Sequence, residues 1–172
     1  MKVLVLYESK TGYTRRYAEW ILEEVKGDLL TLKEATLGRV RAADLLIFGG
    51  NIRGSIISGQ EKMMRLAQKA GGKKTFYFGV GMRPVTPRTL ELLRKNNGIA
   101  ENLFYFRGGL DQEALSPGDR TMLRVYQAML KRRREIHPED EQLLRDLRIP
   151  GDFSDREQIK PLLNAVADQG SL

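Results

Sequence analysis

Short apolar runs alternate along this chain with longer segments in which apolar residues recur at helical spacing. Five runs are rich in β-branched, aliphatic or aromatic residues and show almost no polar alternation: 3–7, 29–32, 44–48, 75–80 and 103–106. Helical periodicity follows the first run over 13–25, the third over 60–70, and the fourth over 87–95, and it returns at the end of the chain over 155–167. Uninterrupted apolar strands are typical of a parallel sheet covered on both faces. The pattern therefore predicts an open α/β sheet flanked by helices, with a short connector before 44 and a Gly- and Ser-containing loop over 51–59.

The pattern changes after the fifth run. Ser116 supplies a capping hydroxyl, Pro117 fits the first helical position and Asp119 places a carboxylate in the first turn, which predicts a helix start. One apolar stripe then follows, made of Met122, Leu123, Tyr126, Met129 and Leu130. About twenty polar residues come next. We therefore expect a single domain over 1–172 that carries an inserted basic helical segment at about 109–153.

Composition excludes several kinds of chemistry. The chain has 172 residues, no cysteine and one histidine, so it has no thiolate nucleophile, Cys-ligated cluster or His-rich metal centre, and no metal site is expected. Its first residues lack a signal-peptide core and no apolar run approaches the roughly 20 residues of a membrane span. We expect a cytoplasmic protein. Of the net charge of +7, a charge of +4 falls within 107–134, which favours an anionic partner for that segment.

Three loops follow predicted strands at the edge where open α/β sheets bind ligands: 9–14, 50–55 and 79–84. In the first, Ser9, Thr11 and Thr14 place hydroxyls around Gly12 at a helix N-terminus, where unpaired N–H groups favour phosphate. The alternative is that Ser9 or Thr11 only caps the helix. No nucleoside-triphosphate loop is present, and the glycines after the fourth strand lack the third glycine of a dinucleotide fingerprint. Tyr17, inside the first helix, is predicted as a core residue.

The first loop resembles the phosphate loop of the flavodoxin superfamily, [ST]-x-T-G-x-T, at its usual place after the first strand. Four further segments resemble the flavodoxin-domain branch that contains menaquinone-dependent protoporphyrinogen dehydrogenase: 47–53, 107–110, the basic helix from Asp119, and 153–159. The resemblance implies a flavodoxin-like three-layer sandwich with a five-stranded parallel sheet of order 2-1-3-4-5. It also implies an FMN-dependent oxidoreductase.

The resemblance further implies noncovalent FMN, with its phosphate on the first loop and its ring between the second and third. The expected cofactor-binding residues are Ser9, Lys10, Thr11, Gly12, Tyr13, Thr14, Gly50, Asn51, Ile52, Arg53, Gly54, Gly79, Val80, Gly81, Met82 and Arg83. Arg53 could place positive charge near the ring, bind an acidic substrate, or be an exposed loop residue. The catalytic residues are not identified from the sequence.

Three functional hypotheses follow. The first is an enzyme that passes electrons from an organic donor, such as a porphyrinogen, through FMN to a quinone or a protein redox partner. The second is a non-enzymatic flavodoxin-type electron carrier. The third, a cofactor-free binding module for anions or nucleic acid, lacks interleaved aromatic and basic residues, and no nucleic-acid partner is expected. The basic helix fits either peripheral contact with acidic phospholipid at the inner face of a membrane, a carboxylate-bearing substrate, or simple packing at the sheet edge. Oligomeric state is left open.

Overall fold

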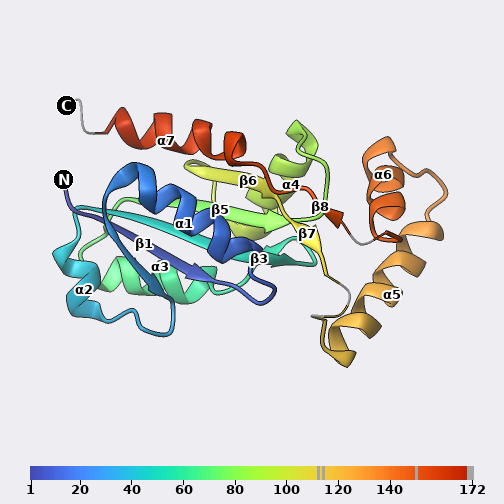
Figure 1. The fold of residues 1–172 in the computed structure, drawn as a ribbon, viewed down its shortest axis with the longest axis horizontal. Helices are drawn as coiled ribbons and strands as arrows, with labels where there is room; N and C mark the ends of the chain where they lie inside the picture. The colour runs from blue at the N-terminus through green and yellow to red at the C-terminus, as the bar shows by residue number, and fades with distance from the viewer. Residues whose placement is uncertain (112, 114, 150, 170–172) are drawn as a thin grey trace.

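The computed structural model describes residues 1–111, 113, 115–149 and 151–169. The remaining residues, which belong to the predicted insertion and to the end of the predicted domain, lie outside the described residues. Figure 1 shows the elements in chain order: β1 (Val3–Glu8), α1 (Tyr13–Val25), β2 (Asp28–Thr31), α2 (Leu37–Ala42), β3 (Leu45–Arg53), β4 (Ile56–Ile57), α3 (Gln60–Lys69), β5 (Thr75–Gly81), α4 (Pro87–Asn97), β6 (Leu103–Arg107), β7 (Gly109–Leu110), α5 (Pro117–Lys131), α6 (Pro138–Asp146), β8 (Gly151–Asp152), the 3₁₀-helix η1 (Arg156–Ile159) and α7 (Lys160–Ala167).

The central sheet is parallel, with the order β2-β1-β3-β5-β6. The predicted strand order 2-1-3-4-5 is therefore confirmed, since β5 and β6 are the fourth and fifth predicted strands. The central strands β1, β3 and β5 are largely buried, because helices cover both faces of the sheet, whereas the edge strand β2 is exposed or half-buried. The structure is the expected flavodoxin-like α/β sandwich.

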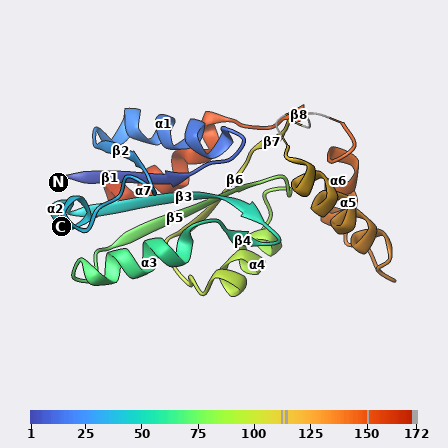
Figure 2. The ribbon, with the colours of Figure 1, turned by 90° about the horizontal axis from the view of Figure 1, so that it is seen from below.

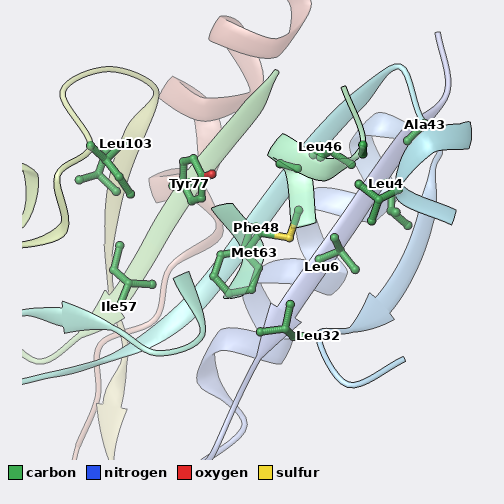
Figure 3. Close-up of a cluster of buried hydrophobic side chains, with 14 of the residues drawn as sticks. Leu4, Leu6, Leu32, Ala43, Leu46, Phe48, Ile57, Met63, Tyr77 and Leu103 are labelled. Carbon is green, nitrogen blue, oxygen red and sulfur yellow. The ribbon is translucent and has the colours of Figure 1, made fainter. Parts of the chain in front are cut away.

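Two apolar clusters hold the three layers together. One joins α1 and α7 to the sheet and includes Tyr17, Ile21, Phe78, Phe106 and Leu162. The other lies on the opposite face, with α2, α3 and α4, and Figure 3 shows how Leu6, Phe48 and Met63 pack together in it. Alternate residues of one strand belong to opposite clusters, because successive side chains of a strand point to opposite faces of the sheet. The prediction that Tyr17 is a core residue is confirmed: its side chain is fully buried.

The sequence-based boundaries were wrong in two places, and one helix of the insertion had not been delimited. The connector before β3 contains the short helix α2, begun by Thr36, whose hydroxyl accepts the Arg39 N–H. The predicted loop over 51–59 is a continuation of β3 to Arg53 and an antiparallel return in β4. The polar stretch after Arg134 contains α6, whose buried Leu143 and Leu144 were hidden among charged residues.

The segment between β6 and η1 stands beyond the carboxyl ends of the parallel strands (Figures 1 and 2). β7 and β8 pair antiparallel at its base, and α5 packs on α6 through a third apolar cluster of its own that contains Leu110, Leu130 and Leu147. α5 therefore does not lie along the edge of the sheet. The residues of the apolar stripe predicted in α5 differ in burial: the side chain of Leu130 is buried, whereas Met122 and Met129 are about half exposed. Among the described residues, no helix has the length and apolar character needed to cross a membrane.

Candidate functional site

A cavity of about 240 Å³ lies between the carboxyl ends of the strands and the helices α5 and α6. The loops after β1, β3, β5 and β6 all reach it, so it sits where open α/β sheets receive ligands. Its walls also include residues of α4, α5 and α6 and the residue that follows α6: Thr89, Leu92, Leu93, Asp119, Met122, Leu123, Tyr126, Leu143 and Leu147. The segment 109–153 thus forms one wall of the site rather than a separate body.

The first loop presents hydroxyls and free helix N–H groups to the cavity. Gly12 is the N-cap of α1 with φ 91°, and no side chain caps the helix. Ser9 instead accepts the Gly12 N–H at 3.2 Å within the loop. The alternative interpretation, that Ser9 or Thr11 caps α1, is therefore wrong. Thr11 and Thr14 line the cavity, and Thr14 is almost fully buried. Such a set of donors suits an anion with several oxygens.

The second loop is a tight hairpin turn. Gly54 and Ser55 both have positive φ, 56° and 73°, as a two-residue type I′ turn between antiparallel strands requires. The buried Asn97, at the end of α4, clamps the turn: its amide group donates to the Ser55 carbonyl at 2.9 Å, and its carbonyl oxygen accepts the Ile57 N–H at 2.8 Å. Asn97 therefore positions Asn51, Ile52 and Arg53 at the cavity.

Arg83, in the third loop, is tied to the inserted helices. Its guanidinium donates to Asp140 of α6 at 2.7 Å and to the Tyr126 hydroxyl of α5 at 2.6 Å. Asp140 is fully buried and also faces Arg133 at 3.2 Å and Arg88 at 3.8 Å. Burial by itself would lower the pKa of Arg83, but the electrostatic and hydrogen-bond contributions of Tyr126 and Asp140 outweigh it, so the pKa lies above its ordinary value. Arg83 is a fixed cation at all physiological pH values.

Asp119 joins the first two loops to α5. Its carboxylate forms ion pairs with Lys10 and, at 3.1 Å, with Arg53, and it accepts the Ser116 hydroxyl at 2.5 Å. These contacts, led by the hydrogen bond from Lys10, lower the pKa of Asp119 from 3.8 to about 2. Lys10, Arg53 and Asp119 all line the cavity. One carboxylate of the inserted segment therefore lies between two cations of the sheet loops.

The loop after β6 closes the site from the side of α1. A Cβ on Gly108 would come within 2.9 Å of Val80, and one on Gly109 would overlap the ring of Tyr13, so both glycines allow the backbone to pass beneath Tyr13. Arg107 lies 3.9 Å from the centre of the Phe153 ring and pairs with Asp146 of α6. This contact fixes the base of the inserted segment against β6.

Of the sixteen residues expected from the sequence, twelve line one cavity: Lys10, Thr11, Tyr13, Thr14, Asn51, Ile52, Arg53, Gly54, Val80, Gly81, Met82 and Arg83. Ser9, Gly12, Gly50 and Gly79 do not line it. Ser9 and Gly12 shape the first loop. A Cβ on Gly79 would lie 2.8 Å from Ile52, and one on Gly50 would overlap the Ser58 carbonyl. These two glycines allow the hairpin to pack closely on the sheet.

The sequence interpretation did not identify the residues that come to the site from α4, α5 and α6. Asp119 was recognised only as a first-turn carboxylate and Tyr126 only as part of an apolar stripe, and Asn97 was not singled out. Each has at least one partner that is 40 or more residues away in the chain. A local signal existed for Asp119 and Tyr126, which are seven positions apart and so share one face of a helix.

Comparisons with known proteins give one matching family and several similar solved structures. A family model described as "Flavodoxin domain" matches residues 4–137. A flavodoxin from the domain Archaea is 20% identical with a TM-score of 0.47, covering 74% of this chain and 98% of that one. The two-electron reduced flavodoxin of Megasphaera elsdenii is 18% identical with a TM-score of 0.46, covering 84% and 97%. The Trp repressor binding protein from Bacillus subtilis is 18% identical with a TM-score of 0.47, covering 85% and 97%. No curated protein matches the chain.

Proposed function

The chain belongs to the flavodoxin domain family, and from this premise we propose that it binds FMN noncovalently and acts as an oxidoreductase. The observation that carries the proposal is the meeting of four sheet loops and two inserted helices around one cavity. The cavity walls combine a hydroxyl-rich loop with a largely apolar chamber. That combination suits a phosphorylated cofactor next to a small organic substrate.

The donors of the first loop fit the phosphate of FMN. The hydroxyls of Thr11 and Thr14 and the N-terminus of α1 supply neutral donors, and the positive end of the helix dipole favours an anion. Gly12 has open space on its Cβ side, so nothing fills the approach to the loop there. Asn51 and Ile52 from the hairpin and Gly81 and Met82 from the loop after β5 would flank the ring.

When bound, FMN supplies two-electron oxidation and reduction, so the protein need only bind, orient and protect the reactants. Asn97 would hold the hairpin at the ring through the Ile57 N–H and the Ser55 carbonyl. α5 and α6 would exclude water from the chamber, since Leu123, Leu143 and Leu147 line it. Arg83 would keep a fixed positive charge at the chamber wall.

The covered chamber favours an enzyme over the second candidate, a flavodoxin-type electron carrier, because a carrier needs only an exposed cofactor edge. A finer proposal, that the donor is a porphyrinogen and the acceptor a quinone, rests on the segments that resemble menaquinone-dependent protoporphyrinogen dehydrogenase. Anaerobic assays with a porphyrinogen plus a quinone, beside assays with a reduced protein carrier, separate the two candidates. Turnover only in the carrier assay would favour the carrier.

The cofactor assignment is tested by the absorbance spectrum of the purified protein and by FMN titration. We expect a flavin spectrum. Replacing Thr11 and Thr14 together with Val removes hydrogen bonds to a charged group worth about 1.5–3 kcal/mol each, so the Kd for FMN is expected to rise about 100-fold or more. Thr121→Val, on the exposed surface of α5, is the matched control. A colourless protein that takes up no FMN, or a double variant with unchanged Kd, would contradict the assignment.

A further inference from the structure

The side of α5 that faces the cavity presents an acidic, an apolar and a phenolic side chain, in that order along the helix. Asp119, Leu123 and Tyr126 all line the cavity, and their spacing of four and three residues places them on one helix face. Asp119 meets Lys10 and Arg53, Leu123 belongs to the apolar cluster under the helix, and Tyr126 accepts a hydrogen bond from Arg83. The seven helical steps from Asp119 to Tyr126 span about 10 Å along the helix axis.

At the charged end of this face, two cations hold a carboxylate that belongs to the protein itself, that of Asp119. Lys10 comes from the loop after β1 and Arg53 from the end of β3, and both side chains remain nearly half exposed, at 44% and 47%. The Asp119 side chain between them is 12% exposed. Two cations that share one carboxylate keep a net positive charge, and an incoming carboxylate can make the same charge-assisted hydrogen bonds.

We propose that Lys10 and Arg53 anchor the carboxylate of an apolar organic acid, which replaces Asp119 while its apolar body lies along α5 toward Tyr126. This inference rests on the proposed function, because it names the substrate class of the same site. Asp119 is then an internal competitor: it holds the N-terminal end of α5 on the sheet loops until a substrate carboxylate takes its place. Displaced Asp119 keeps its hydrogen bonds with Ser116, whose hydroxyl contacts both its carboxylate and its N–H.

The apolar part of the chamber accounts for the rest of the ligand. Leu92 and Leu93 of α4 and Met122 and Leu123 of α5 all line the cavity, and apart from Asp119 no charged side chain of these two helices lines it. The hydroxyl proton of Tyr126 is not used by the hydrogen bond from Arg83, because there the hydroxyl oxygen is the acceptor. It can donate to an oxygen at the far end of the ligand.

The test is a binding measurement on purified protein, with and without saturating FMN, using 4-phenylbutyrate and its neutral amide as probes. Removing the internal competitor with Asp119→Asn is expected to tighten phenylbutyrate binding about threefold to tenfold, and the double variant Lys10→Gln/Arg53→Gln to weaken it about tenfold, as for exposed ion pairs. The amide is expected to respond to neither change. Asp119→Ser, which also removes the charge, is a second variant with the same expected result.

Asp111→Asn is the matched control, because it also removes a negative charge from the cavity wall. Tightening by Asp119→Asn that is no greater than by Asp111→Asn, or an amide that follows the acid, would overturn the proposal. Tightening of FMN in place of the acid would overturn it too, since Lys10 would then serve the cofactor phosphate. A wild-type chain that takes up no FMN refutes the proposed function instead, and leaves the competition between acid and Asp119 measurable.

Discussion

The contacts of Asp140 predict that Asp140→Asn strongly destabilises the docking of α6. The carboxylate is fully buried and faces Arg83 at 2.7 Å, Arg133 at 3.2 Å and Arg88 at 3.8 Å. Removing one partner of a buried pair costs about 3–5 kcal/mol. Arg88 and Arg133 are about 40% exposed and can be hydrated, whereas Arg83 is only 16% exposed. We therefore expect the lower end, about 3 kcal/mol, to come mainly from Arg83.

The assay is urea unfolding followed by far-UV circular dichroism, which reports all helices, and by the fluorescence of Trp20, which lies in α1. If the midpoint of the circular dichroism transition moves to lower urea by more than the midpoint of the Trp20 fluorescence transition does, the loss of stability lies in α5 and α6. The control is Asp28→Asn, whose partner Lys2 is 3.9 Å away with both side chains more than half exposed, and which is expected to change stability by about 0.5 kcal/mol or less. A loss below about 1 kcal/mol for Asp140→Asn would refute the reasoning.

Three further predictions concern the core, the base of the insertion and pH. Gly49→Ala places a methyl group against the buried ring of Phe78, and we expect it to lower the free energy of thermal or urea unfolding by at least about 1–3 kcal/mol. The control Gly38→Ala, in α2 with open space around it, is expected to be neutral or slightly stabilising. Equal effects of the two substitutions would contradict this prediction. Tyr17→Phe removes two hydrogen bonds of the hydroxyl, one donated to the Arg107 carbonyl at 2.6 Å and one accepted from the Asp155 N–H at 3.1 Å. We expect the free energy of unfolding to fall by about 2 kcal/mol. A loss no larger than that of the control Tyr7→Phe would count against this prediction. The pKa of Asp119 is lowered from 3.8 to about 2, so its ion pairs contribute their full stability above pH 3.8, and this contribution is lost as the pH falls through about 2. Acid unfolding is therefore expected to be steeper in the wild type than in Asp119→Asn. Identical acid transitions would refute the ion pairing of Asp119.

The alternation of strands and helices could be predicted because its signals are local, whereas the strand order was implied by the resemblance to the flavodoxin superfamily. Apolar runs such as 3–7 and 75–80 are continuous, since a central parallel strand is buried on both faces, and α1 shows its buried side at helical spacing. Ser116 and Pro117 begin α5 as expected, because capping depends on a few neighbouring residues. The first loop was found for the same reason: its hydroxyls and glycine are consecutive.

α2, β4 and α6 were missed because local composition did not distinguish them from loops. α2 and β4 are short, and α6 begins among charged residues. α6 is held by Asp140, whose partner Arg83 is 57 residues away. β4 is held by the Asn97 clamp, 40 residues away from Ile57. Propensity is a weak prior in such segments, and tertiary contacts override it.

The sequence by itself determined the sheet, its helical cover and the phosphate-type loop after β1, because periodicity and capping are properties of neighbouring residues. Only the tertiary structure decided what the remaining site residues do. It turned Gly50 and Gly79 toward the hairpin instead of the cavity, and it placed Asp119 between Lys10 and Arg53, 66 residues from the latter. A charged side chain shows its sign in the sequence, but its partner is set by how distant loops converge at the carboxyl edge of a folded sheet.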